Sequence, residues 1–353
     1  MSRDIHEQRK TEHLRIALEE TGVSSYVKTG LERYRFLHLA LPEIDLESIS
    51  TACEFLGHKL ACPLLISSMT GGTPAAGELN ERLARVAQEF GIALALGSVR
   101  AAVENESLVP TFRVRRWAPD VFLLCNLGAV QLNYGYGRDE CMRAVEITEA
   151  DALVLHLNPL QEAFQPSGNT RFAGLLRKIE RLVRDLPVPV VVKEVGWGIS
   201  GDVARRLVDC GVSAVDVAGA GGTSWSEIES LRMGPDDPLR KAAEDFREWG
   251  IPTAEAIRQA REECPDIPLI ASGGLRTGID LAKAIALGAD IGGIALPFLR
   301  AAAVSEAALR DEVTRVLRGL RLAMFCIGAE SISALRATDR LQSVPPEEHG
   351  VGR

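Results

Sequence analysis

The sequence predicts an α/β protein folded as a (β/α)8 (TIM) barrel with an N-terminal helical extension, because eight apolar runs alternate with helix-like stretches. Each run is short, and glycine or polar residues follow it. Continuous apolar runs are typical of strands buried on both faces of a parallel sheet. The runs lie at residues 63–69, 92–98, 121–127, 152–158, 188–195, 214–218, 268–272 and 291–296. Eight consecutive β-then-α units favour a closed barrel.

Apolar residues at helical spacing predict helices between most of these strands. The helices are expected at residues 78–90, 172–184, 201–210, 254–263 and 277–287. Thr277 and Asp280 form the pattern of a capping box at the start of the last one. A doubly wound open sheet is the alternative, and it is less favoured because no GxGxxG motif follows the first strand. No repeat beyond the βα unit is recognised in the sequence.

Segments outside the eight units complete the expected organisation. Residues 1–50 form an N-terminal extension, residues 51–338 the barrel, and residues 339–353 a C-terminal tail. Within the extension, residues 9–20 have the apolar stripe of a helix, and a final helix is expected at residues 306–327. The segment 343–353 is rich in Pro, Glu and Gly and is expected to be mobile.

Composition limits the kinds of partner. The chain of 353 residues has a formal charge of −8, which argues against a general nucleic-acid or membrane-surface role, so an anionic substrate would need a local cationic patch. Seven cysteines with no CxxC pair make a disulfide framework or a zinc site unexpected and suggest a reducing, cytoplasmic compartment. The first ten residues lack the apolar core of a signal peptide, and no transmembrane helix is expected.

The most informative segment is the fourth strand and the residues after it, 153–162, where an apolar run ends in polar side chains. Val154, His156 and Asn158 share one face of the strand, and Gln161 and Glu162 are expected in the following loop. Buried polar groups cost free energy unless something satisfies them. The segment is therefore either a hydrogen-bonded strand end or one wall of an active site. Because further strands end in the same way, the active site is the favoured interpretation.

The later strands indicate a phosphate-bearing ligand. Lys193 follows three valines, so it either forms a salt bridge inside the barrel, faces an electron-rich ligand such as a flavin ring, or forms a Schiff base. Glycine-rich loops at 219–223 and 272–274 follow the sixth and seventh strands, with Arg276 close behind. Barrels commonly bind a phosphate near the last strands through backbone N–H groups. These loops favour flavin contact over a Schiff base for the lysine.

Two further features have both a functional and an ordinary interpretation. Arg9, Lys10 and His13 can face one side of the N-terminal helix, as a clamp for an anion or as a solvated face, and Glu12 places an acid among them. Glu162 could hold Mg²⁺, a hard cation that prefers carboxylate and phosphate oxygens. It could equally be an ordinary acid at the start of a helix.

Taken together, these motifs resemble the type 2 isopentenyl diphosphate isomerase family, FMN-dependent barrel enzymes. The resemblance covers roughly residues 9–330 in order. The motifs that carry it are Arg9-Lys10-x-x-His13, Ser68-Met69-Thr70-Gly71-Gly72, Gly97-Ser98-x-Arg100, Asn126-Leu127-Gly128, His156-Leu157-Asn158-x-x-Gln161-Glu162, Val192-Lys193-Glu194-Val195-Gly196, Gly221-Gly222-Thr223, Ala271-Ser272-Gly273-Gly274-Leu275 and the helix 282–289. The strand-4 motif together with the Arg-Lys-x-x-His start is specific to the family, whereas the glycine loops alone would indicate only an FMN or phosphate barrel.

The resemblance implies a role for each candidate residue. FMN would contact Ser68, Met69, Thr70, Ser98, Asn126, Lys193 and Thr223, with its phosphate at Gly273, Gly274, Arg276, Ala295 and Leu296. The substrate diphosphate would meet Arg9, Lys10, His13, Ser98, Arg100, His156 and Asn158. Gln161 and His156 would be the catalytic side chains, with Gln161 near the allylic carbon, and Glu162 would hold Mg²⁺ on the diphosphate.

The resemblance also implies a reaction. Family enzymes act on a small diphosphate in isoprenoid biosynthesis and need reduced flavin, usually supplied by NADPH, although the isomerisation is redox-neutral. A homo-oligomer, tetramer or octamer, is implied as well, with no nucleic-acid or membrane partner. Moving a C=C bond requires adding and removing protons at carbon, and His156 is the only ordinary base at the strand ends. Reduced flavin is thus the expected acid/base.

Rival enzymes of the same fold fit less well. A hydroxy-acid oxidase would need a His–Arg pair after the sixth strand, where residues 221–225 contain no histidine. An enzyme like inosine monophosphate dehydrogenase would need a nucleophilic cysteine in a glycine loop, and none lies there. A nucleotide-binding regulator would leave His156, Asn158 and Gln161 unexplained.

Overall fold

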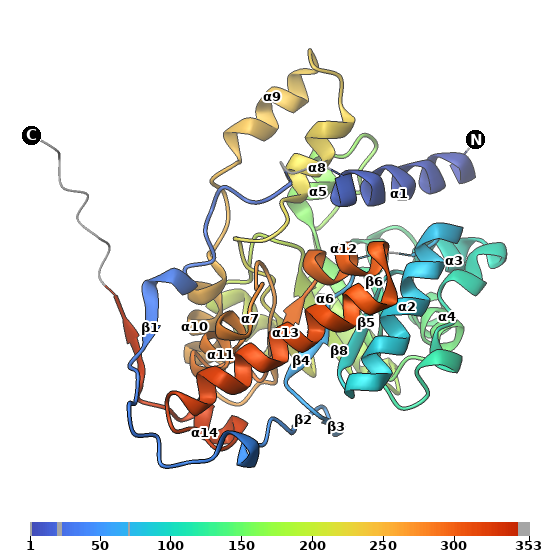
Figure 1. Cartoon of the computed structure of the whole chain (residues 1–353). Helices are drawn as coiled ribbons and strands as arrows, with labels where there is room; N and C mark the ends of the chain where they lie inside the picture. The colour runs from blue at the N-terminus through green and yellow to red at the C-terminus, as the bar shows by residue number, and fades with distance from the viewer. Residues whose placement is uncertain (1, 20–22, 70, 345–353) are drawn as a thin grey trace, which may run out of the picture.

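A computed structural model shows eight parallel strands closed into a barrel, which confirms the predicted fold (Figure 1). The structure describes residues 2–19, 23–69 and 71–344, with side chains from residue 10 onward. The strands follow one another around the barrel in chain order, and each falls on a predicted apolar run. They are β4 (Leu64–Ile66), β5 (Ala93–Ser98), β6 (Leu123–Gly128), β7 (Ala152–Leu157), β8 (Val190–Glu194), β9 (Ala214–Asp216), β10 (Leu269–Ala271) and β11 (Ile291–Ile294).

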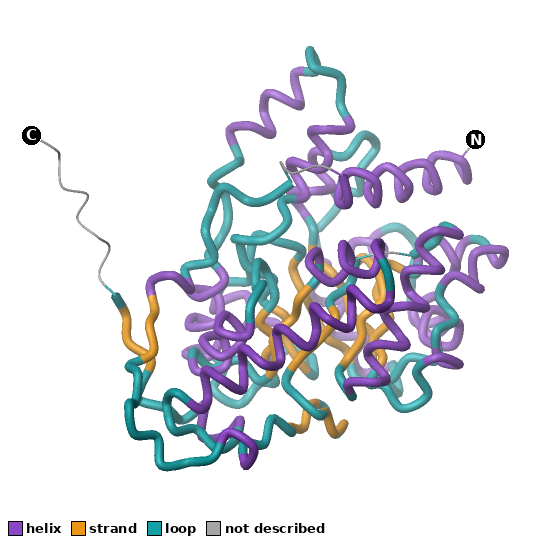
Figure 2. The backbone as a smooth tube through the Cα atoms, viewed as in Figure 1, coloured by secondary structure: helices purple, strands orange, loops and turns teal. Residues whose placement is uncertain are grey.

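Helices surround the strands, as the tube drawing shows (Figure 2). The long ones are α2 (Pro74–Phe90), α4 (Arg138–Thr148), α6 (Leu175–Asp185), α7 (Gly201–Asp209), α10 (Thr253–Glu263), α11 (Gly278–Ala286) and α13 (Glu306–Phe325). The shorter ones are α3 (Arg100–Glu104), α5 (Pro159–Phe164), α8 (Trp225–Arg232), α9 (Pro238–Asp245), α12 (Leu296–Val304) and α14 (Ile332–Arg336). All five predicted inter-strand helices are confirmed, and so is the capping box of Thr277 and Asp280. None of the helices in the described ranges is long and apolar enough to cross a membrane.

The N-terminal end of the barrel is closed by apolar packing. Side chains from the eight strands form an inner cluster, and Phe55 and Leu60 of the hairpin β2 (Cys53–Phe55) and β3 (His58–Leu60) join it. The ring of His58 stacks on Phe122 with 4.3 Å between the ring centroids. Because this end is filled, the opposite end, where the strands finish, is left to hold polar groups.

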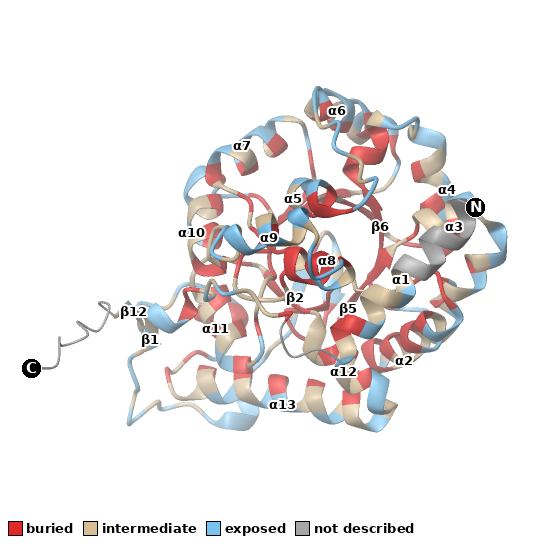
Figure 3. Ribbon diagram, turned by 90° about the horizontal axis from the view of Figure 1, so that it is seen from above, coloured by how far each residue is buried: buried red, intermediate tan, exposed pale blue. Residues whose placement is uncertain are grey.

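The N-terminal helix α1 (Ser2–Glu19) lies over that opposite end. It contacts α8 and α12, and Ile16 and Val23 pack against Ile228 of α8 in a small buried cluster. Seen from above, α8 lies over the middle of the ring of strands and α1 lies to one side of it (Figure 3). The two helices therefore form a roof above the strand ends.

The two ends of the chain meet in a small sheet. Strand β1 (Tyr34–Phe36) pairs antiparallel with β12 (Leu341–Ser343). Ser343, the first residue of the segment expected to be mobile, is thus part of a strand, and that expectation is wrong for this residue. Backbone pairing offsets the polar, proline-rich composition that suggested mobility. The backbone N–H of Val344, the next residue, donates to the carbonyl oxygen of Arg33 at 2.6 Å, and residues 345–353 lie outside the described residues.

One arrangement occurs twice, four strands apart, although the sequence showed no repeat beyond the βα unit. Asp151, just before β7, accepts the first backbone N–H of the preceding strand at 2.8 Å and pairs with Arg115 at 2.9 Å. Asp290, just before β11, accepts the corresponding N–H at 2.7 Å and pairs with Arg261 at 2.9 Å. Both arginines also donate to nearby backbone carbonyls. We call each set an arginine clasp; the two tie adjacent strands together at the N-terminal end of the barrel.

Candidate active site

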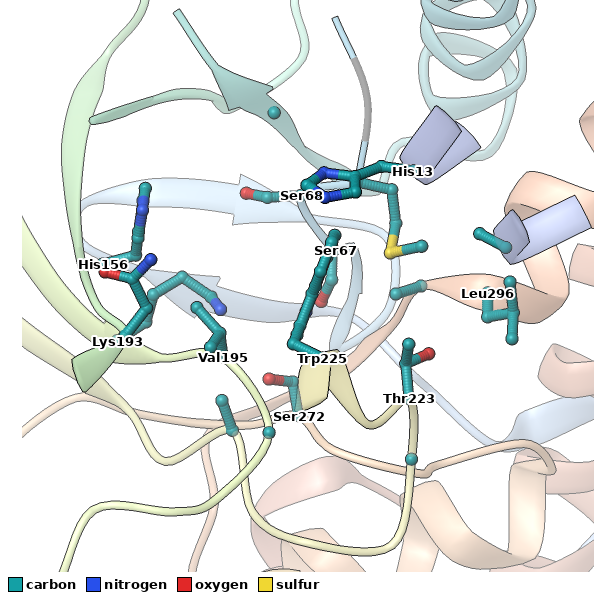
Figure 4. Close-up of a pocket in the computed structure, with 18 of the residues that line it drawn as sticks. His13, Ser67, Ser68, His156, Lys193, Val195, Thr223, Trp225, Ser272 and Leu296 are labelled. Atoms are coloured by element: carbon teal, nitrogen blue, oxygen red, sulfur yellow. The ribbon is translucent and has the colours of Figure 1, made fainter. Parts of the chain in front are cut away.

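A cavity of about 580 Å³ lies at the C-terminal ends of the strands, beneath α1 and α8 (Figure 4). All the predicted site residues whose side chains are described line it, which brings together segments far apart in the sequence. They are Lys10, His13, Ser68, Met69, Ser98, Arg100, Asn126, His156, Asn158, Gln161, Glu162, Lys193, Thr223, Gly273, Gly274, Arg276, Ala295 and Leu296. The side chain of Arg9 and the whole of Thr70 lie outside the described residues. This placement groups the residues, and their individual roles stay predictions.

His156 is held by a chain of polar contacts across three strands. Its Nδ1 lies 2.6 Å from Asn126 Oδ1, and Asn126 Nδ2 donates to Ser68 Oγ at 3.2 Å. An amide oxygen only accepts, so a hydrogen bond at this contact requires a proton on Nδ1. Residue 128 is glycine, and a Cβ there would come within 3.2 Å of His156 Nε2. These contacts hold the ring of His156 in one orientation.

Gln161 and Glu162 lie on the short helix α5 rather than in the expected loop. Pro159 occupies the first turn, where its missing N–H costs nothing, and so allows a helix directly after the strand. Asn158 Nδ2 donates to Gln161 Oε1 and to Glu162 Oε1, both at 3.1 Å. The other oxygen of Glu162 accepts the backbone N–H of Asn169 at 2.5 Å. Both side chains are thus fixed and buried at the edge of the cavity.

Glu229 of α8 is a central residue of the site that sequence reasoning missed. Its buried carboxylate pairs with His13 Nε2 at 3.0 Å and with Arg232 at 2.5 Å, and it accepts from Gln161 Nε2 at 3.2 Å. Burial acts to raise the pKa of Glu229, but the hydrogen bonds and charges of His13 and Arg232 outweigh it and lower that pKa. The glutamate therefore joins α1, α5 and α8 as an ionised group.

A signal for Glu229 was present in the sequence. The helix that begins at Trp225 carries Ser226, Glu227, Glu229 and Ser230, and all four are buried. A helix with so many polar residues after a glycine loop must either face water or cover a polar site. Trp225 itself packs edge-on against the ring of His13, with 5.4 Å between ring centroids. His13 therefore does not lie on a solvated face, which was one of the two interpretations of the N-terminal helix.

Buried charges form the floor of the cavity. Lys193 Nζ donates to the carbonyl oxygen of Glu194 at 2.5 Å. Its register partner on β9 is Asp216, whose carboxylate accepts a hydrogen bond from Ser272 Oγ at 2.7 Å. Burial raises the pKa of Asp216, and the charge of Lys193 opposes that rise. Glu194 accepts three consecutive backbone N–H groups of the loop after β8, and burial raises its pKa to about 7. The lysine is thus anchored, and an acid faces it from the neighbouring strand.

Glycines allow the two loops after β9 and β10 to touch. A Cβ on Gly222 would come within 2.6 Å of the backbone nitrogen of Gly274, and one on Gly273 within 2.1 Å of the carbonyl oxygen of Gly219. Gly273 and Gly274 have positive φ values of 102° and 85°, which favour glycine. Side chains would fill this space, so the bare backbone and the nearby start of α12 make a cradle that suits a phosphate.

The cavity is strongly cationic within an acidic protein. Among the residues whose side chains are described, five Lys or Arg line it, against one carboxylate, that of Glu162. The five are Lys10, Arg100, Lys193, Arg276 and Arg300. The lining therefore carries more positive than negative side chains, although the whole chain carries a formal charge of −8. The local patch that an anionic ligand requires is therefore present.

The site offers little to a bare metal ion. Among the described residues, no group of three or more His, Cys, Asp or Glu side chains could hold one. Glu162 is the lone carboxylate of the lining, and the buried Oδ1 of Asn158 beside it has no hydrogen-bond partner in the described structure. Mg²⁺ accepts few protein ligands when substrate phosphates supply the rest. These oxygens consequently fit an ion that arrives with a diphosphate.

Comparison with known proteins agrees with this geometry. Residues 150–342 match the model of the FMN-dependent dehydrogenase family. Isopentenyl-diphosphate delta-isomerases are close relatives: that of a Nostoc species is 53% identical over 95% of this chain and 96% of its own length, and that of Stutzerimonas stutzeri is 49% identical over 97% and 99%. A further one, from a Synechocystis species, is 52% identical over 94% and 95%.

Solved structures add evidence on the fold alone. A putative lactate oxidase from Pediococcus acidilactici superposes with a TM-score of 0.67 at 15% identity, covering 98% of this chain and 95% of that one. Mandelate oxidase with (S)-2-phenylpropionate gives 0.66 at 20% identity, with 97% of each chain covered. At such low identity these two oxidase structures show only that the barrel fold is the same. The isomerases, in contrast, are identical to this chain at about half of all residues over nearly the full length. The chain therefore belongs to the isopentenyl-diphosphate delta-isomerase family, built on the fold of the FMN-dependent dehydrogenases.

Proposed function

We propose that this chain interconverts isopentenyl diphosphate and dimethylallyl diphosphate, a step of isoprenoid biosynthesis, and uses FMN to do so. The observation that carries the proposal is the cavity lining, which combines a glycine cradle with five cationic side chains. Two phosphate-bearing molecules account for this combination: FMN would take the cradle with Arg276 and Lys193, and the diphosphate would take Lys10 and Arg100. The names of the full-length relatives support the same reaction.

The FMN phosphate fits the cradle of Gly273 and Gly274, with Arg276, Ala295 and Leu296 around it. The ring would lie over Lys193 and against the residues predicted to contact it, which are Ser68, Met69, Ser98, Asn126 and Thr223, with Thr70 completing the predicted set. When bound in its reduced form, FMN would supply the acid/base group that the strand ends lack. NADPH is the proposed reductant, by resemblance to the family.

The substrate diphosphate would lie on the opposite, cationic side of the cavity. Lys10 reaches it from α1, where its Nζ donates to the carbonyl oxygen of Ser98 at 2.9 Å. Arg100 and His156 approach from the ends of β5 and β7, and Ser98, Asn158 and His13 also line the cavity. Arg9 completes the predicted set. Glu162 would hold Mg²⁺ on the diphosphate oxygens, because a carboxylate and phosphates are its preferred ligands. Charge-assisted hydrogen bonds of this kind fix position as well as affinity.

The chain's own side chains would orient the apolar end of the substrate. The reaction adds a proton at the terminal methylene carbon and removes one from the carbon next to the CH₂–O group, so charge and redox state are unchanged. Gln161 is the proposed catalytic neighbour of these carbons, fixed by Asn158 and Glu229. Trp225 and α1 cover the cavity, and excluding water from it protects a reaction that passes through a reactive carbon centre.

One assay tests the proposal. Purified protein should be yellow, bleach with NADPH or dithionite, and convert isopentenyl diphosphate only when the flavin is reduced. Full activity in FMN-free protein would refute the flavin requirement. Mandelate and lactate serve as control substrates, because the fold neighbours carry those names. Oxidation of either with no isomerisation would favour the hydroxy-acid oxidase alternative.

The assembly and the compartment are further parts of the proposal. A homo-oligomer, tetramer or octamer, is inferred from the family resemblance, and a sedimentation experiment would measure it directly. All seven cysteines are free thiols in the structure, which supports a reducing, cytoplasmic environment.

A further inference from the structure

Asp216 is a buried acid at the floor of the cavity to which no role has been assigned so far. It ends β9, is 2% exposed, and is the register partner of Lys193 on β8. Partners on adjacent parallel strands point to the same side, so both side chains face the barrel interior. A space of about 10 Å³, lined by both residues and by Ser67 and Ser68, lies next to them. That space suits at most one water molecule and is too small for a ligand.

The hydrogen bonds of Asp216 favour its ionised form. Its Oδ1 accepts Ser272 Oγ at 2.7 Å and the backbone N–H of Ala218 at 3.2 Å, and donors to a carboxylate stabilise the charge. Burial opposes ionisation and raises the pKa of Asp216, and the charge of Lys193 counteracts that rise. The two donors and the ammonium of Lys193 thus act together in favour of a charged carboxylate, and burial opposes them.

Lys193 is anchored in a way that leaves its charge facing the cavity. Its Nζ donates to the carbonyl oxygen of Glu194, a neutral acceptor that holds the ammonium without cancelling its charge. Figure 4 shows Lys193, Ser67 and Ser272 around the same part of the cavity. Of the two acids nearest to it, Glu194 is turned to the backbone N–H groups of the following loop. Asp216 is thus the acid that faces the ammonium across the strands.

We propose that Asp216 is a positioning residue whose carboxylate is the counter-charge of Lys193, and that it limits how strongly the ammonium favours reduced over oxidised FMN. The inference rests on the proposed function, since it requires FMN above Lys193. Reduction adds two electrons and one proton to FMN and leaves negative charge on its ring. An uncompensated ammonium would stabilise that charge more strongly than a compensated one.

The test measures the midpoint potential of FMN in the reconstituted full-length protein, with dithionite as the electron source. Asp216→Asn should favour the reduced form by about tenfold more than the parent does. For a two-electron couple that is about 30 mV in the positive direction. In a Lys193→Met background the same replacement should cause a smaller shift, because the buried carboxylate then has no facing ammonium to favour its charge. Asp209→Asn, on the exposed face of α7, makes the same change in net charge and should leave the potential unchanged.

Each outcome decides the question. An unchanged potential in Asp216→Asn, or an equal shift with and without Lys193, would overturn the inference while isomerase activity of the parent still supports the proposed function. If Asp216→Asn does not fold, Asp216→Ser takes its place: it also removes the carboxylate and should shift the potential in the same direction. No shift in Asp216→Ser would then refute the role. A parent protein that binds no FMN would overturn the proposed function and the inference together.

Discussion

Glu162→Gln is the substitution that separates a metal ligand from an ordinary acid at a helix start. In the parent structure both carboxylate oxygens are used: Oε1 accepts from Asn158 Nδ2 at 3.1 Å, and Oε2 accepts the backbone N–H of Asn169 at 2.5 Å. An amide can keep only one of these oxygens as an acceptor. The amide oxygen would stay with the shorter bond, the one from the backbone N–H of Asn169. The new NH₂ group would then face Asn158.

The structure also shows how the mutant can adapt. Asn158 Oδ1 has no hydrogen-bond partner in the described structure, so a flip of this amide would present an acceptor to the new NH₂ group, and it would give up the bond from Asn158 Nδ2 to Gln161 Oε1. Losing one neutral hydrogen bond costs about 0.5–1.5 kcal/mol, so folding should survive and the main effect of the substitution is the lost charge. A hydrogen bond to a charged group contributes about 1.5–3 kcal/mol. If Mg²⁺ loses a ligand of that strength, its affinity falls by about 10- to 150-fold, since each 1.4 kcal/mol is tenfold.

The assay is the initial rate of isopentenyl diphosphate conversion at fixed substrate over a range of Mg²⁺ concentrations. Half-maximal activity should need at least tenfold more Mg²⁺ in Glu162→Gln, and excess Mg²⁺ should restore part of the rate, while the FMN dissociation constant stays within about twofold of the parent. Glu306→Gln is the matched control, because Glu306 lies in the first turn of α13, away from the cavity. An unchanged Mg²⁺ dependence in Glu162→Gln would refute the reasoning and restore the helix-start interpretation.

Three further sets of substitutions test the remaining roles. Lys193→Met should impair flavin-dependent turnover because the ammonium no longer balances charge on the reduced ring; a mutant that holds FMN and turns over at the parent rate would contradict this. Replacing Arg9 and Lys10 by Ala should raise KM by about tenfold or more per residue with FMN titration unchanged, and lost flavin at constant KM would refute that placement. In the arginine clasps, Arg261→Met and Arg115→Met should each lower the free energy of unfolding by about 2–3 kcal/mol, additively in urea titrations and with KM constant. Stability equal to the parent's would show that the clasps are dispensable.

The sequence was sufficient for the barrel because each strand is a local signal. Continuous apolar runs such as residues 121–127 and 188–195 need no knowledge of their neighbours to be recognised, and the right-handed βα connection then leaves few ways to arrange them. Strand ends were predicted to within a few residues for the same reason. Pairing of β1 with β12 could not be predicted, because it joins residues about 300 positions apart and both strands are short.

The candidate site was predictable where its residues follow buried strands, and not where they come from the roof. His156 and Lys193 stand out because each interrupts an apolar run. The polar composition of α8 signals a polar site, but Glu229 is one of several polar residues there. Its own importance appears only when α1, α5 and α8 converge on it. The arginine clasps were missed for a related reason: the spacing between each Arg and its Asp differs, 36 residues in one and 29 in the other, so no sequence period exists.

A single rule connects the inner core to the site around the whole barrel. On every strand, a residue of the inner apolar cluster is followed two positions later, on the same face, by a polar residue or a glycine at the cavity floor. The inner residues are Leu65, Ala95, Leu124, Val154, Val191, Ala214, Ile270 and Ile291. Those that follow are Ser67, Gly97, Asn126, His156, Lys193, Asp216, Ser272 and Gly293.

This rule explains why the polar floor can exist at all. Each polar side chain stands directly above an apolar one in a filled barrel, so it has no route toward the N-terminal end and must point into the cavity. Two of the eight positions are glycines, Gly97 and Gly293, and glycine leaves space above the floor. A Cβ at Gly293 would come within 2.3 Å of Ser67 Oγ and would fill that space. A shift of any strand by one residue would exchange its two faces, and its polar residue or glycine would no longer lie at the cavity floor. The apolar layer therefore sets the register on which the chemistry depends, and it does so without contacting any ligand.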